Sequence, residues 1–181
     1  MLETHKSRAE VRDHILMIAG SLFATKGVNG VTLDDVLEQA DVSRTTLYRY
    51  FRGREELLAE HLRRLDIPSR NSLVEAAERN ATGPRVALLD LFDALGRWFR
   101  KPNFCGCIFT NTSIALSASP RHPAHRAAIA HKDGVRAWIR AKVEELGIAG
   151  TEEGVSATEE LSDALMLLEK EPSSPLLCEE T

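Results

Sequence analysis

The chain has 181 residues, of which 43% are apolar and 28% charged, a composition ordinary for a globular protein with one sizeable core or two smaller ones. Its net charge of −4 argues against a general polyanion binder, and no apolar run approaches the roughly 18–20 residues that span a bilayer. Charged residues stand where a signal peptide would be apolar, and the three cysteines form no even disulfide framework. We therefore expect a cytoplasmic protein without membrane association.

Helical periodicity begins near the start of the chain. An apolar stripe over residues 11–23 predicts a helix from about residue 8 to residue 26. Ser7 and Glu10 have the spacing of a capping box, and Gly27 is typical of a helix stop. No segment of the sequence alternates like a strand between hairpin turns, which favours an all-α fold.

Two short helices are predicted next. Thr32 can cap the first, and Ser43 can cap the second after a break at Asp41-Val42. A longer helix follows over about residues 55–66, and Pro68 is expected to kink or end it. The inner faces of the two short helices are predicted to be Leu33, Val36, Leu37 and Ala40 in the first, and Leu47, Tyr50 and Phe51 in the second.

The remaining sequence predicts a larger helical unit. Its helices are expected over about residues 84–100, 107–117, 124–146 and 156–170. Pro172 and Pro175 forbid a regular helix after that, so residues 172–181 are predicted to be a disordered tail. The predicted organisation is an N-terminal three-helix domain over 8–68, a second helical domain over 69–171, and the tail.

The segment Ser43–Arg54 is a basic island in an acidic protein. It contains Arg44, Arg49, Arg52 and Arg54 and no acidic residue. On charge alone, a solvated helix face explains this as well as a phosphate contact does. However, two short helices with a three-residue break match the helix-turn-helix pattern, in which the second helix enters the major groove.

Residues 32–51, TLDDVLEQADVSRTTLYRYF, resemble the signature of the TetR family, and Glu-Glu-Leu-Leu at 55–58 also fits. The resemblance extends over residues 8–68. It implies a homodimeric transcription regulator, usually a repressor, that leaves operator DNA when a small molecule enters its C-terminal domain. By the resemblance, phosphates would be contacted by Thr32, Ser43, Thr46 and Tyr48, and bases by Arg44, Thr45 and Arg49. Arg52 and Arg54 complete the predicted DNA-binding set.

Two positions depart from the family pattern. Leu37 stands where the family usually has alanine, and we expect it to open the angle between the two short helices. Asp41 stands where the tight turn usually has glycine. Because aspartate tolerates the left-handed conformation better than most residues, the turn is expected to survive.

The cysteines and histidines give little indication of a metal, redox or catalytic site. Cys105-Gly-Cys107 lacks a usual set of zinc ligands, so packed or partly exposed cysteines are favoured over a metal or redox site. His122, His125 and His131 are interpreted as structural histidines. No catalytic arrangement, metal site or cofactor motif is evident, and we expect no enzyme activity. An effector pocket in the second domain is predicted to be lined by Phe92, Trp98, Phe99, Phe104, Phe109 and Trp138.

The C-terminal sequence keeps an alternative open. TetR-family chains usually end in two helices that pair across a dimer, whereas the helical pattern here stops near Lys170. The alternative is therefore a helical interaction protein, or a truncated regulator with impaired dimerisation and DNA binding.

Overall fold

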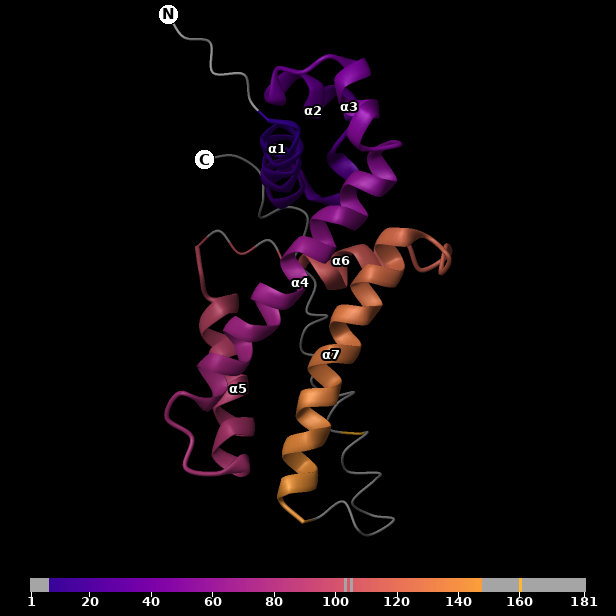
Figure 1. Cartoon of the computed structure of the whole chain (residues 1–181). Helices are drawn as coiled ribbons and strands as arrows, with labels where there is room; N and C mark the ends of the chain where they lie inside the picture. Colours follow the sequence, from indigo (N-terminus) through magenta and orange to yellow (C-terminus); the bar gives the residue numbers. More distant parts are fainter. Residues whose placement is uncertain (1–6, 103, 105, 148–159, 161–181) are drawn as a thin grey trace, which may run out of the picture.

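The computed structural model describes residues 7–102, 104, 106–147 and 160. Within these residues the fold is all-α, as predicted: seven helices and no strand. Figure 1 shows α1, α2 and α3 gathered at one end of the molecule, with α4 running from them toward α5. The helices are α1 Arg8–Gly30, α2 Leu33–Ala40, α3 Arg44–Tyr50, α4 Arg54–Glu78, α5 Pro84–Phe99, α6 Ile108–Ala115 and α7 Pro123–Glu145.

The first helix begins where the sequence predicted, and at the predicted stop it kinks and then continues to Gly30. The Ser7 side chain accepts from the backbone N–H of Glu10, and the Glu10 carboxylate accepts from the backbone N–H of Ser7. Gly27 has φ +72°, a left-handed conformation that favours glycine, and it kinks the chain before a last helical turn to Gly30. These local signals therefore set the start of α1 and the position of its kink.

Helix α4 is longer than predicted, because Pro68 lies inside it and does not end it. A proline inside a helix costs about 3 kcal/mol through the missing donor and the clash of its ring. Here α4 packs along both α5 and α7, and Arg70 pairs with Asp66 across the proline at 2.8 Å. Tertiary packing thus holds a helix that local sequence would have broken.

Three acid–base pairs join α4 to α7. The acids all come from α4, and the bases come from α7 and its N-cap residue His122, in the same order along both helices. The two helices therefore run side by side in the same direction. The pairs are Glu55 with His122 at 3.5 Å, Asp66 with His131 at 2.9 Å, and Glu78 with Lys142 at 3.0 Å.

Two clusters of buried apolar residues form the core. The upper core unites α1, α2, α3 and the first half of α4 with Phe109 of α6 and with Ala124 and Ala128 of α7. The lower core joins α5, the second half of α7 and Ala77 near the end of α4. The predicted boundary between residues 68 and 69 lies inside the continuous α4, and the upper core draws on residues well beyond it.

The other helices described follow the prediction closely. Pro84 opens α5, Cys107 is the N-cap residue of α6, and Gly147, with φ +72°, follows the end of α7. In the part of the chain that the structure describes, no helix is long and apolar enough to cross a membrane. The described residues do not include Cys105, Cys178 or the predicted tail over 172–181. Of the predicted helix over 156–170 they include only Glu160.

Candidate nucleic-acid interface

The short helix α3 is set by its own cap. Ser43, in an extended conformation, accepts a hydrogen bond on Oγ from the backbone N–H of Thr46 at 3.1 Å. Its hydroxyl also lies 2.9 Å from Thr46 Oγ1. The first turn contains no acidic residue and the last turn contains Arg49. This arrangement agrees with the cap predicted for Ser43.

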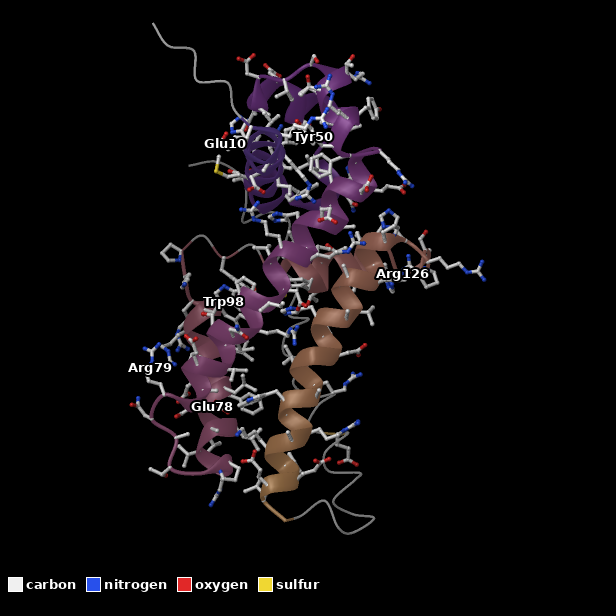
Figure 2. All side chains as sticks on the ribbon, viewed as in Figure 1. Glu10, Tyr50, Glu78, Arg79, Trp98 and Arg126 are labelled. Carbon is white, nitrogen blue, oxygen red and sulfur yellow. The ribbon has the colours of Figure 1, made fainter. Side chains whose placement is uncertain are left out.

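One face of α3 is buried and the other is open. Leu47 and the following Phe51 are each only 1% exposed within the upper core. Tyr50 is partly buried against the same core, and Figure 2 shows it in the part of the molecule formed by α1 and α3. The outward face is formed by the exposed side chains of Arg44, Thr45, Tyr48 and Arg49, with Arg52 exposed just after the helix.

The turn between α2 and α3 is held by backbone hydrogen bonds. Asp41 adopts φ 50° and ψ 50°, the left-handed conformation that the sequence required of it. Val42 N–H donates to the carbonyl of Leu37 at 3.2 Å, and His14 Nε2 lies 3.1 Å from the carbonyl oxygen of Ala40. Leu37 is partly buried against the upper core, while its effect on the angle between the two helices stays a prediction.

Thr32 lies at the start of α2, where it forms a capping box with Asp35. The Thr32 backbone N–H donates to Asp35 Oδ2 at 2.7 Å, and the Asp35 backbone N–H donates to Thr32 Oγ1 at 3.1 Å. Lys26 Nζ lies 2.5 Å from the Asp35 carboxylate. The hydrogen bond from Lys26, followed by those from Thr32, holds the pKa of Asp35 well below its usual range. Any contact of Thr32 with a phosphate would therefore come from a threonine already engaged in capping.

Arg54 has a different environment from the rest of the basic island. Its Nε donates to the carbonyl of Val31 at 2.7 Å, and its Nη2 donates to the carbonyl of Val28. The guanidinium therefore ties the start of α4 to the connection between α1 and α2. Charge pattern alone could not separate Arg54 from its neighbours, since both carbonyls lie more than twenty residues away in sequence. These contacts favour a structural role for Arg54, and its contact with DNA stays a prediction.

Arg44 has a partner that the sequence reasoning missed. Its Nη2 pairs with Asp34 Oδ1 of α2, and both side chains are largely exposed. The two residues are ten positions apart and belong to different helices, so helical spacing did not connect them. An acidic side chain thus lies on the outward face of the helix-turn-helix, against its first arginine.

Four of the six aromatic residues predicted for an effector pocket pack against the lower core, namely Phe92, Trp98, Phe99 and Trp138. Trp98 lies 4.9 Å from Phe104 and 5.7 Å from Phe99 between ring centroids. Phe109 belongs to the upper core, whereas Phe92 and Trp138 pack against the lower core. Whether any of them contacts an effector stays a prediction.

Two of the three histidines have clear structural roles. His122 caps α7 by accepting on Nδ1 from the backbone N–H of Ala124 at 3.1 Å. His131 is 6% exposed, and its ring stacks on Phe109 with centroids 3.6 Å apart. Burial lowers the pKa of His131, although its contact with Asp66 opposes that shift. The structural interpretation of these two residues fits their contacts.

The fold and the open, basic, acid-free α3 define a helix-turn-helix protein of all-α architecture. Comparison with known proteins gives the same class. Residues 15–61 match the family described as bacterial regulatory proteins, tetR family. Over this segment the chain is a member of the TetR family.

Relatives of known structure are similar over almost the whole chain. A TetR-family transcriptional regulator from Streptomyces coelicolor is 28% identical, covers 94% of this chain and 89% of its own, and has a TM-score of 0.72. A TetR transcriptional regulator from Streptomyces avermitilis has the same fold, with a TM-score of 0.76 at 24% identity over 96% of this chain and 87% of its own.

Among curated relatives, the similarity is confined to part of each chain. The HTH-type transcriptional repressor KstR2 of Mycolicibacterium smegmatis is 31% identical over 61 residues, which are 34% of this chain and 30% of the relative. The repressor BepR of Brucella suis is 29% identical over 99 residues, or 51% of this chain and 47% of the relative. The matches thus span less than half the length of these two relatives.

Proposed function

We propose that this chain is a sequence-specific DNA-binding transcription regulator of the repressor type. The observation that carries the proposal is the outward face of α3. The opposite face of α3 is buried and anchors the helix through Leu47, whereas Thr45, Tyr48 and Arg49 on the outward face are exposed. Hydroxyl groups and guanidinium groups on such a helix can contact phosphates and the edges of bases in the major groove.

Different residues of this face would contact different parts of the DNA. Arg49 and Thr45 are the candidates for reading bases, and Tyr48 and Ser43 for holding phosphates. Thr46 is partly buried and bonded to Ser43, so its role is to fix the start of α3 as well as to meet the backbone of the duplex. The names of the curated relatives, which are repressors, support DNA-binding regulation over a helical interaction protein.

The test is a binding titration with DNA. Duplexes are first selected from a random-sequence pool by the wild-type chain, and affinity is then measured by fluorescence anisotropy at several salt concentrations. Arg49→Ala is expected to weaken binding to the selected duplex by 1–3 kcal/mol, roughly 5- to 150-fold, if the arginine meets a guanine with both N–H groups. Affinity is expected to fall steeply as salt rises.

A matched control separates this effect from loss of one positive charge. Arg85 is exposed on α5, away from α3, and Arg85→Ala removes the same charge. We expect it to leave binding to the selected duplex within about twofold, since a distant exposed charge is screened at ordinary ionic strength. If no duplex is enriched over random DNA, or if both variants bind alike, sequence-specific recognition by α3 is wrong.

The remaining parts of the proposal are a homodimer, a small-molecule effector and a cytoplasmic location. A dimer would place two copies of α3 about one helical turn of DNA apart, or a multiple of it. The selected duplexes should then contain inverted repeats, and a duplex with a single half-site should bind far more weakly. An effector is expected to act through the second helical region, and release of the bound duplex is its assay.

A further inference from the structure

The ion pair between Asp34 and Arg44 contributes little to holding the fold. Asp34 is the second residue of α2, and the capping box of that helix uses Asp35 in its place. The side chain of Asp34 is 76% exposed and that of Arg44 is 58% exposed. Ion pairs that are this open to water stabilise proteins weakly. The carboxylate lies in the first turn of α2, where it interacts favourably with the helix dipole, and an exposed acid at either of the two positions there would serve that purpose.

The position is unusual for an acid if the outward face meets DNA. A carboxylate beside α3 repels phosphates and lowers the affinity for every sequence alike. It also occupies an N–H group at Nη2 of the first arginine on the recognition helix, because a carboxylate accepts from a guanidinium just as a phosphate or a guanine edge does. Arg44 cannot swing toward a phosphate without giving up this partner.

The pair also limits the directions in which Arg44 can donate. Arginine has five N–H donors in a rigid fork, so a guanidinium bound to Asp34 through Nη2 keeps its remaining donors within a narrower range than a free arginine does. A base edge at the matching position can still accept from them. A phosphate elsewhere within the reach of a free arginine cannot. Unselected DNA therefore loses more from the pair than a matching sequence does.

We propose that Asp34 is a specificity-determining residue, which holds Arg44 away from phosphates so that the chain rejects unselected DNA. The inference rests on the proposed DNA-binding function and adds a residue outside α3 to it. It assigns to α2 a repulsive element that works beside the attractive contacts of α3.

The experiment measures discrimination, defined as the affinity for the selected duplex divided by the affinity for a scrambled duplex of the same length. Asp34→Asn keeps the size of the side chain and removes its charge. We expect the scrambled duplex to bind more tightly and discrimination to fall by roughly 5- to 10-fold, with the salt slope for scrambled DNA steeper by about one phosphate contact.

The chain offers a matched control. Asp13 of α1 forms an exposed pair with Arg64 at 2.7 Å, with side chains 56% and 54% exposed. Asp13→Asn changes the net charge by the same amount and breaks a similar pair on other helices. We expect it to change both affinities by one common factor and to leave discrimination unchanged.

A second variant tests the route of the effect. With Arg44→Gln in the background, Asp34→Asn should no longer change discrimination, because the side chain that it restrains is gone. Equal discrimination in wild type and Asp34→Asn overturns the inference, and so does an equal loss in Asp13→Asn. A wild-type chain that binds selected and scrambled duplexes alike overturns the proposed function as well, which separates the two failures.

Discussion

Burial of His131 beside Asp66 makes the stability of the fold depend on pH. Asp66 Oδ1 lies 2.9 Å from His131 Nδ1 and accepts from Arg70 Nε at 2.8 Å, while Asp66 Oδ2 accepts from Arg70 Nη2 at 3.0 Å. Burial raises the pKa of Asp66, but the hydrogen bonds from Arg70 and His131 outweigh it, and the net shift is downward. One carboxylate thus joins two basic groups at the middle of the α4–α7 contact.

The sign for His131 follows from its lowered pKa. The folded chain binds this proton less readily than the unfolded chain, in which the pKa is near 6.5. Stability should therefore be constant above about pH 6.5 and fall as the pH drops from there toward the folded pKa. His61, whose pKa burial also lowers, adds to the loss in the same window. Asp66 affects stability only at lower pH. Because its pKa is lowered on folding, the stability that it contributes is lost only as the pH falls below 3.8.

Replacing Asp66 with asparagine should show how much its ion pairs with Arg70 and His131 stabilise the fold. Breaking a fully buried pair by removing one partner costs about 3–5 kcal/mol, and side chains that are 22% and 33% exposed reduce this to roughly 1–3 kcal/mol. Without the carboxylate, the pKa of His131 should fall further, so acidification should cost Asp66→Asn more stability than it costs wild type.

Urea denaturation at pH 8, 7, 6 and 5 is the assay. His131→Gln should flatten the dependence on pH between 6.5 and 5, leaving the part that His61 contributes. The control is His125→Gln, a partly buried histidine on the same helix, which should stay within about 0.5 kcal/mol of wild type at each pH. If His131→Gln keeps the full slope of wild type, His131 is not the group that titrates and the reasoning fails.

Three further substitutions test other features. Ser43→Ala should lower the free energy of unfolding by about 1 kcal/mol through loss of the cap on α3, and weaken DNA binding in the same titration; an unchanged midpoint in urea would contradict the role of the cap. Arg54→Ala should cost about 1–3 kcal/mol of stability through its lost hydrogen bonds to carbonyls. The dependence of its DNA affinity on salt concentration should equal that of wild type. A shallower dependence would show that Arg54 contacts a phosphate. Gly27→Ala should cost about 1 kcal/mol because φ +72° strains a residue with a Cβ, and thermal unfolding would show no loss if α1 can end otherwise.

Features that depend on a few neighbouring residues could be predicted from sequence. The caps at Ser7, Thr32 and Ser43 and the left-handed turn at Asp41 each follow from side-chain chemistry within four residues. The outward face of α3 also follows, because burial of Leu47 leaves the opposite side exposed. These elements carry both the family resemblance and the proposed function.

Features that depend on distant partners could not be predicted. Pro68 is exposed, and it remains inside a helix because α4 packs along α5 and α7, which come later in the sequence and are not visible in the residues next to the proline. Arg54 and Arg44 share one basic run in the sequence, yet one donates to backbone carbonyls and the other to Asp34. Their roles are decided by which helices meet in space.

The composition of the upper core has a consequence for synthesis of the chain. Residues of α1, α2 and α3 are packed against Phe109, Ala124 and Ala128, which the ribosome delivers long after Phe51. At a translation rate of about 5–20 residues per second, roughly 4 to 15 seconds pass between the synthesis of Phe51 and the synthesis of Ala128, the last of these core residues. During that interval its apolar surface stays open to chaperones and to neighbouring nascent chains. The region proposed to read DNA is therefore synthesised before α6 and α7, and its core is completed only after they follow.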